Sequence, residues 1–256
     1  MEKVTTAYFS PTGNSKKYSI LLAEKIGLPF KELDFTKREN RQNNFEFSKG
    51  DIVIFSAPVY AGRLPNINLF ENIEGNGAYA VCMVTYGNRE YDDALLELKN
   101  ICEQKGFYVI AAVAWIGKHT YSDVLGADRP NEKDVLKIEE LAVYLQNSME
   151  KQDFLGKHLK VKGNPNYCEH KALSFVPQPD EKCSQCGSCV KKCPVGAING
   201  KTLLADAEKC ISCFACVKGC TRHARKIEDS FFPKLVEKLE KNLKDVEKEA
   251  EIFLLE

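Results

Sequence analysis

The sequence lacks any segment that would carry the chain into or across a membrane. No apolar run in its 256 residues approaches the roughly 20 residues that a transmembrane helix needs. The first residues, Met1 to Thr6, lead directly into a strand-like segment and contain no apolar core of a signal peptide. We therefore expect a cytoplasmic protein with no membrane span.

An excess of charge and the common nucleotide motifs are absent too. Lys and Arg together number 36, as do Asp and Glu, so the formal net charge is zero and no nucleic-acid partner is expected. The chain contains neither GxxxxGK[ST] nor GxGxxG. This absence disfavours a site for a nucleoside triphosphate or a dinucleotide.

Cysteine, in contrast, is abundant and unevenly distributed. The chain has 11 cysteines, and eight of them lie between Cys183 and Cys220. In an exported protein such a number would suggest disulfides. Without an export signal, cysteines gathered at one end of the chain indicate metal ligation in a reducing compartment.

Residues 1–152 alternate between strand-like and helix-like segments. The predicted strands are Val4–Phe9, Phe30–Phe35, Asp51–Ala57, Ala78–Tyr86 and Phe107–Ile116. We expect helical stretches after the first, third, fourth and fifth strands, among them Ser15–Ile26, Tyr91–Lys105 and Glu132–Lys151. This alternation predicts an α/β domain with a doubly wound, five-stranded parallel sheet.

The remainder of the chain divides by composition into three parts. Residues 153–180 are polar and contain Pro and Gly, which indicates a linker. The cysteine-rich region covers residues 181–229. In residues 230–256 apolar side chains recur at spacings of three and four, which predicts an amphipathic C-terminal helix from about Phe232 to Leu255. We expect this helix to dock on the chain's own domains; a coiled-coil dimer seam is the alternative, so the protein is either a monomer or a dimer.

The eight clustered cysteines form two copies of one pattern. The first run is Cys183-x2-Cys186-x2-Cys189-x3-Cys193-Pro194, and each cysteine of the second run lies 27 positions later. Three cysteines at two-residue gaps can direct their thiolates into one concavity, as a cubane 4Fe–4S cluster requires; in two-cluster proteins the fourth cysteine ligates the other cluster. We therefore predict cluster I on Cys183, Cys186, Cys189 and Cys220, and cluster II on Cys210, Cys213, Cys216 and Cys193.

A pair of zinc sites is the alternative, because CxxC pairs also suit tetrahedral zinc. Zinc sites usually combine two CxxC pairs across a longer gap, and the triple spacing here fits iron–sulfur ligation better. Residues 181–228 resemble the bacterial two-cluster ferredoxins, which are small α+β domains. Thr221 departs from that pattern, because proline usually follows the fourth cysteine of the second run. This departure puts the local geometry and solvent access near Cys220 in doubt.

The three other cysteines do not fit the pattern. Cys82 falls in a predicted strand and Cys102 on a predicted helix, so both are expected in the core. Cys168 lies in the linker, where it is either a free thiol or a neighbour of a cluster.

The loop after the first predicted strand has the composition of a phosphate site. It contains Ser10, Thr12, Gly13, Asn14 and Ser15 and leads into a predicted helix. The N-terminus of a helix presents unpaired N–H groups and a positive dipole end, the hydroxyl groups can add hydrogen bonds, and Gly13 permits close approach. The alternative is a Ser/Thr-rich turn that only caps the helix.

Two further loops follow the third and fourth predicted strands. In a doubly wound sheet the carboxyl ends of the strands border the ligand crevice. Each loop supplies a tyrosine, a glycine and polar groups, so together they could stack on and hydrogen-bond to a flavin. The candidate residues are Pro58, Val59, Tyr60, Ala61, Gly62, Thr85, Tyr86, Gly87 and Asn88.

With these loops, residues 1–150 resemble flavodoxins, whose FMN phosphate loop the Ser-x-Thr-Gly-x-Ser segment matches. The order of a flavodoxin-like domain followed by a two-cluster ferredoxin domain resembles the EFR1 family ferredoxins of anaerobic bacteria. Two segments resemble that family, from Pro58 to Pro65 and from Thr85 to Ala94. The resemblance implies a bound FMN, electron transfer and an anaerobic cytoplasm.

A few residues near the predicted site have more than one interpretation. His119 follows the fifth strand and either reaches the flavin side or acts as a capping or supporting histidine. Trp115, within that strand, is expected in the core. The cations around the clusters either steer an acidic partner or compensate the negative charge of the clusters; they are Lys191, Lys192, Lys218, Arg222, Arg225 and Lys226.

Taken together, the sequence predicts an electron-transfer protein that relays electrons between FMN and two 4Fe–4S clusters and exchanges them with redox protein partners. Two alternatives stay open. One is a flavoenzyme whose clusters feed FMN for the reduction of a quinone-like or nitro compound. The other is an interaction or sensor module in which the clusters are structural.

Overall fold

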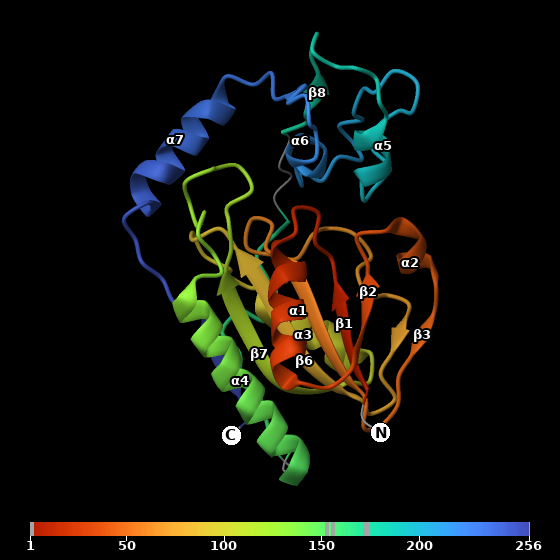
Figure 1. The fold of residues 1–256 in the computed structure, drawn as a ribbon, viewed down its shortest axis with the longest axis vertical. Helices are drawn as coiled ribbons and strands as arrows, with labels where there is room; N and C mark the ends of the chain where they lie inside the picture. Colours follow the sequence, from red (N-terminus) through yellow and green to blue (C-terminus); the bar gives the residue numbers. More distant parts are fainter. Residues whose placement is uncertain (1–2, 152–153, 155–156, 171–174, 256) are drawn as a thin grey trace.

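The computed structural model describes residues 3–151, 154, 157–170 and 175–255. Its parallel strands are β1 (Val4–Tyr8), β2 (Phe30–Asp34), β4 (Ile52–Pro58), β6 (Tyr79–Tyr86) and β7 (Tyr108–Ile116). They lie in the spatial order β7-β6-β4-β1-β2, which is the 2-1-3-4-5 order of flavodoxin-like doubly wound folds (Figure 1). The predicted five-stranded parallel sheet is confirmed, and every strand begins and ends within one residue of its predicted bounds.

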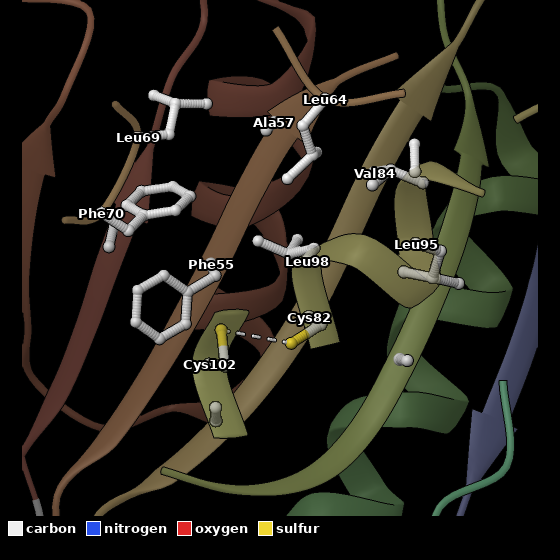
Figure 2. Packing of buried hydrophobic residues seen from close by; sticks show 14 of the residues in the cluster. Phe55, Ala57, Leu64, Leu69, Phe70, Cys82, Val84, Leu95, Leu98 and Cys102 are labelled. Carbon is white, nitrogen blue, oxygen red and sulfur yellow. Dashed lines mark hydrogen bonds between the residues drawn. The ribbon is translucent and has the colours of Figure 1, made fainter. Parts of the chain in front are cut away.

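Helices cover both faces of this sheet. The helices α1 (Asn14–Ile26) and α4 (Glu132–Lys151) pack on one face, where Leu22 and Leu145 lie against strand residues such as Ile54. The helix α3 (Ala94–Gln104) packs on the other face against Phe55 and its neighbours. Figure 2 shows this second layer, in which the sulfur atoms of Cys82 and Cys102 lie 3.6 Å apart. Both cysteines are buried in the core, as expected.

The C-terminal segment differs from its prediction. The helix α7 (Phe231–Leu243) ends well before Leu255, and the chain then forms a strand, β10 (Glu251–Leu254). This strand pairs antiparallel with β7 and makes the sheet six-stranded. The reason is non-local: β7 would otherwise end the sheet with a row of unpaired N–H and C=O groups, which an added strand satisfies.

The segment between the third and fourth parallel strands also differs from its prediction. No helix follows β4; a loop leads to the short strand β5 (Ile73–Glu74), which pairs with β3 (Phe45–Glu46). The polar stretch after β2, which had no predicted structure, contains the one-turn helix α2 (Arg38–Gln42). Phe35, Phe45 and Phe70 pack together beneath this irregular edge.

The linker and the cysteine region form the remaining structure. Of the predicted linker, residues 153, 155–156 and 171–174 lie outside the described residues; the amides of Asn164 and Cys168 donate to Asp93 at 2.7 Å. The cysteine region is a small α+β unit with the helices α5 (Ser188–Lys192) and α6 (Ala215–Lys218). Its strands β8 (Gln178–Pro179) and β9 (Arg225–Lys226) pair antiparallel.

The 27-residue repeat of the sequence is also a repeat of backbone conformation. Gln185 and Ser212 both have positive φ angles, of 55° and 52°. The same holds for Gly187 and Phe214, at 71° and 60°, and for Gly196 and His223, at 65° and 51°. Each pair is separated by 27 positions, so the two halves turn at equivalent places.

The small unit lies over the carboxyl ends of the parallel strands, where α5 and α6 face the loops of the sheet (Figure 1). Ion pairing supports this placement, because Lys218 of α6 lies 2.8 Å from Asp123, which follows β7. Within the described residues, no helix is both long and apolar enough to cross a membrane.

Candidate functional site

The predicted phosphate loop is held in place by hydrogen bonds to three neighbouring segments. The amide of Ser10 donates to Thr36 Oγ1 at 2.8 Å, and Asn14 Nδ2 donates to the Lys118 carbonyl at 2.8 Å. The hydroxyl groups of Ser15 and Thr85 lie 2.7 Å apart. Gly13 has a φ of 94° at the start of α1 and provides no side-chain cap, while Ser10 Oγ accepts a hydrogen bond of 3.0 Å from the Lys16 amide. The amides that precede Lys16 in the first turn of α1 are therefore the ones available for a ligand.

A cavity of about 220 Å³ lies at the carboxyl edge of the sheet beside this loop. Ten of the predicted flavin residues line it, namely Thr12, Asn14, Pro58, Val59, Tyr60, Ala61, Gly62, Thr85, Tyr86 and Gly87. Ser10, Gly13 and Ser15 are outside the lining and shape the loop instead. The three strand-end loops thus meet at one site.

Asn88 has a different position from the one predicted. Its side chain is outside the cavity lining, and its Nδ2 donates to the carbonyls of Leu243 and Val246 at 3.1 and 2.9 Å. Asn88 therefore fixes the chain as it leaves α7. Its Oδ1 is buried and has no hydrogen-bond partner among the described residues.

Close approaches shape the walls of the cavity. A Cβ atom at Gly87 would lie 2.3 Å from His119 Cδ2, and one at Gly62 would lie 2.4 Å from Asp92 Oδ2. The loop after β4 is anchored by Arg63, whose guanidinium makes two bonds of 2.8 Å to Glu97. Side chains larger than glycine at these two positions would displace the walls of the cavity.

His119 lines the cavity next to Tyr121. Its Nδ1 accepts a hydrogen bond of 3.1 Å from the Tyr121 amide, and the two rings are 5.5 Å apart. Burial lowers the pKa of His119 to about 4. At neutral pH the imidazole is therefore an uncharged polar group in the cavity wall.

Several lining residues are ones that sequence reasoning missed. Tyr121 follows β7, Ser212 belongs to the cysteine region, and Leu235 and Leu239 come from α7. No local pattern marks them, because they reach the cavity only when separate parts of the chain dock. The spacing of Leu235 and Leu239 did indicate an apolar helix face, and this face covers the cavity.

The cavity shares a wall with the cysteine region. The Tyr121 hydroxyl donates to the Ser212 carbonyl at 3.4 Å, and Ser212 lies between Cys210 and Cys213. The Tyr121 ring is also 4.6 Å from that of Phe214 and 5.4 Å from that of Phe232. Burial raises the pKa of Tyr60 well above its ordinary value, and nearby Cys213 adds to the rise.

The eight clustered cysteines line two separate cavities. Cavity I, of about 110 Å³, is lined by Cys183, Cys186, Cys189 and Cys220. Cavity II, of about 20 Å³, is lined by Cys193, Cys210, Cys213 and Cys216. The structure thus groups the cysteines as the two predicted ligand sets, each with the fourth cysteine of the other run.

The surroundings of the two cavities differ. In cavity II Cys193, Cys213 and Cys216 are buried, and burial raises the pKa of the Cys213 thiol to about 12. In cavity I Cys186 is exposed, and Cys220 is only half-buried beside the exposed Thr221. Backbone contacts repeat, because Ala197 N lies 3.2 Å from Cys193 Sγ and Ala224 N lies 3.4 Å from Cys220 Sγ. The cysteines of cavity I are therefore the more exposed of the two sets.

Cys168 lies apart from both groups of cysteines. Its carbonyl accepts a hydrogen bond of 2.6 Å from Arg63 Nη1, and its amide donates to Asp93.

Trp115 is fully buried in the sheet, as expected.

Residues 177–221 match the family model of a 4Fe–4S dicluster domain, a segment that contains all eight clustered cysteines. No curated protein matches the chain. Among solved structures, an archaeal flavodoxin is similar over 58% of this chain and 99% of its own, with 13% identity and a TM-score of 0.40. A Streptococcus pneumonia TIGR4 flavodoxin is similar over 57% of this chain and 99% of its own, with 16% identity and a TM-score of 0.40. An NADH:FMN oxidoreductase in its apo form is similar over 58% of this chain and 90% of its own, with 13% identity and a TM-score of 0.42.

The fold assignment depends on the strand order rather than on these distant likenesses. The strand order and the matched domain together define a class: an iron–sulfur protein with a flavodoxin-like α/β domain and a redox, electron-transferring role. Membership of the EFR1 family ferredoxins stays a prediction.

Proposed function

We propose that the protein relays electrons between an FMN at the carboxyl edge of the sheet and two 4Fe–4S clusters in the cysteine region. The observation that carries this proposal is the shared wall of the flavin cavity. Ser212, from the loop between Cys210 and Cys213, lines that cavity together with Tyr60 and Tyr121. Cluster II would therefore be the cluster closer to the flavin.

The residues of the cavity suit FMN chemically. Thr12 and Asn14 would hold the phosphate at the start of α1, where amide groups and the helix dipole favour an anion. Tyr60 and Tyr86 offer aromatic rings for the isoalloxazine, and His119 offers a neutral polar group. Asn88 is not part of this proposed set, because its amide is used at the end of α7. When bound, FMN exchanges one or two electrons, whereas each cluster exchanges one.

The two groups of cysteines suit cubane clusters by their number and ligand type, although cavity II, at about 20 Å³, must widen to admit one. Each is lined by four thiols, three from one loop and one from the other run. This crossed grouping is the arrangement of two-cluster ferredoxins and supports the proposed ligand sets. It also ties the two runs together, so loading either cluster would stabilise the whole unit.

Between the proposed centres the chain supplies aromatic side chains. Tyr121 and Phe214 are 4.6 Å apart, and Phe232 of α7 contacts both of them, at 5.4 and 5.5 Å. These three side chains hold the cysteine region against the sheet domain. Their role in the relay is to fix the distance between the centres and to exclude water from the joint.

The proposal is tested by replacing Thr12 with leucine in the full chain, prepared without oxygen. A branched apolar side chain beside the start of α1 is expected to abolish FMN retention. Iron and sulfide should stay at about eight of each per chain, the content of two cubanes. The matched control is Thr202→Leu, because Thr202 is exposed in the cysteine region and far in sequence from the phosphate loop.

FMN released by acid and measured by fluorescence gives the first readout, and iron and sulfide analysis gives the second. Unchanged FMN in Thr12→Leu would refute the phosphate site, whereas stoichiometric zinc in place of iron would refute the clusters. Anaerobic reduction of the chain then tests the relay, because electrons given to the clusters should appear on FMN. Saturable turnover of a quinone or nitro compound would instead favour the flavoenzyme alternative.

A further inference from the structure

The second half of the cysteine repeat contains a charged residue where the first half has an apolar one. Ile198 lies five positions after Cys193 and lines cavity II, with 6% of its surface exposed. Arg225 lies five positions after Cys220 and lines cavity I, with 4% of its surface exposed. The two residues are therefore structural equivalents, and cavity I receives a guanidinium in place of a butyl group.

The charge of Arg225 lacks a full set of partners within the described part of the chain. Its Nη1 donates to the Leu203 carbonyl at 2.6 Å. Its Nε and Nη2 are buried without a regular hydrogen-bond partner among the described residues, and the guanidinium also contacts the Cys216 thiol, where its charge and a hydrogen bond oppose the rise in pKa that burial causes. Burying a charge is costly unless it is paired and hydrogen-bonded, so a ligand that supplies negative charge and acceptors would satisfy this side chain.

The surroundings of Arg225 indicate what that ligand is. The guanidinium lines the cavity of Cys183, Cys186, Cys189 and Cys220, where four thiolates and a cluster would together be anionic. It also lies close enough to Cys210 and Cys216 to oppose the rise in thiol pKa that burial causes there. Arg225 therefore lies between the two cavities and lines cavity I.

We infer that Arg225, which lies between the two cavities, is a tuning residue that raises the reduction potentials of both proposed clusters. Reduction adds one negative charge to a cluster, so a buried cation next to it favours the reduced state. Net charge and hydrogen bonds to sulfur are among the factors that set cluster potentials. This inference rests on the proposed clusters and not on the proposed FMN relay.

The test is an anaerobic potentiometric titration of the full chain, with the reduced clusters followed by EPR. In the wild type we expect two one-electron couples. Arg225→Ile restores the repeat, because isoleucine is the residue that the first half has at this position. We expect it to weaken reduction of both clusters by about tenfold, which is about 59 mV for a one-electron couple.

Two further variants separate charge from packing. Arg225→Lys keeps the charge and should shift either midpoint by less than about threefold in the equilibrium constant. Lys226→Ile removes a positive charge from an exposed side chain outside the cavity linings and should shift either midpoint by less than about threefold, because water screens the lost charge. Iron and sulfide content is measured for every variant.

Several results would overturn the inference. Unchanged midpoints in a fully loaded Arg225→Ile would do so, as would an equal shift in Lys226→Ile. If Arg225→Ile fails to load, Arg225→Gln replaces it as the neutral variant. Loss of clusters in both neutral variants but not in Arg225→Lys would support the need for charge, whereas loss in all three would assign Arg225 a packing role. A wild-type chain without iron and sulfide would refute the clusters themselves.

Discussion

Acidification is expected to weaken the fold through one partly buried side chain, His119. Burial lowers the pKa of this imidazole to about 4, from an ordinary value of 6.5, while Glu240 and Lys218 have smaller and opposite effects. Between these two values the unfolded chain binds the proton more readily than the folded chain. The stability that the neutral imidazole contributes is therefore full above about pH 6.5 and is lost as the pH falls toward about 4.

The size of this effect follows from the two pKa values. Between about pH 7.5 and about pH 5.5, proton linkage gives a loss of about 1.3 kcal/mol in the free energy of unfolding. The restricted pH range avoids the stronger acid in which carboxylates and cluster ligands become protonated. His119→Gln removes the titrating group while an amide oxygen can still accept the hydrogen bond that the Tyr121 amide donates to His119.

The assay is urea unfolding of the loaded chain at both pH values, followed by circular dichroism and by fluorescence of Trp115, four positions before His119. Over this pH range the free energy of unfolding of the wild type should fall by about 1.3 kcal/mol more than that of His119→Gln. The control is His223→Gln, because His223 is an exposed histidine of the cysteine region. If His119→Gln kept the full pH dependence of the wild type, the argument from its burial would be refuted.

Two further predictions concern backbone geometry. Phe214 has a φ of 60° where the first half of the repeat has Gly187. The Phe214→Gly variant should therefore be more stable than Phe214→Ala by about 1 kcal/mol, measured by loss of cluster absorbance in urea. The reverse order of stability would contradict backbone strain at this site. Gly87→Ala should destabilise the chain by about 1–3 kcal/mol and reduce FMN retention, because the added Cβ would meet His119. The control Gly200→Ala meets no atom within 4 Å and should stay within about 0.5 kcal/mol of the wild type; equal effects would refute the close approach.

The parallel sheet was predictable because its strands are buried on both faces. Runs such as Val53–Phe55 and Ile110–Ala114 are apolar at nearly every position, and helices cover them on either side. The last residues of the chain were not predictable in the same way. The spacing of Val246, Ala250 and Phe253 fits a helix, but pairing with the edge of β7 decides the conformation from Glu251 onward. A single sequence does not reveal a free sheet edge.

The residues of the candidate site were likewise predictable only where local sequence determines their position. Loops at the ends of strands were identifiable, because the order of strands dictates that their carboxyl ends meet. Tyr121, Ser212 and Leu235 were not, because they reach the cavity only after the cysteine region and α7 dock on the sheet. Arg225 is an intermediate case: comparing the two halves of the repeat position by position would have exposed it, whereas grouping it with the surface cations concealed it.

Three physically costly departures from the repeat lie in its second half: Phe214, Arg225 and His223, which like Phe214 has a positive φ where the first half has glycine. Phe214 has a backbone conformation that suits glycine, and its ring contacts Tyr121 in the wall of the proposed flavin cavity. Arg225 accepts burial of a charge, and its guanidinium lines cavity I. The cost at Phe214 fastens the loop of Cys210 and Cys213 to the sheet domain, and the cost at Arg225 would favour the reduced form of the proposed clusters on either side of it. Lowering the cluster potentials in Arg225→Ile, without changing Phe214, should therefore shift the equilibrium between the clusters and FMN toward reduced FMN. The reduced fraction of FMN, measured by absorbance after anaerobic equilibration, checks this expectation, and an unchanged fraction in a fully loaded variant would contradict it.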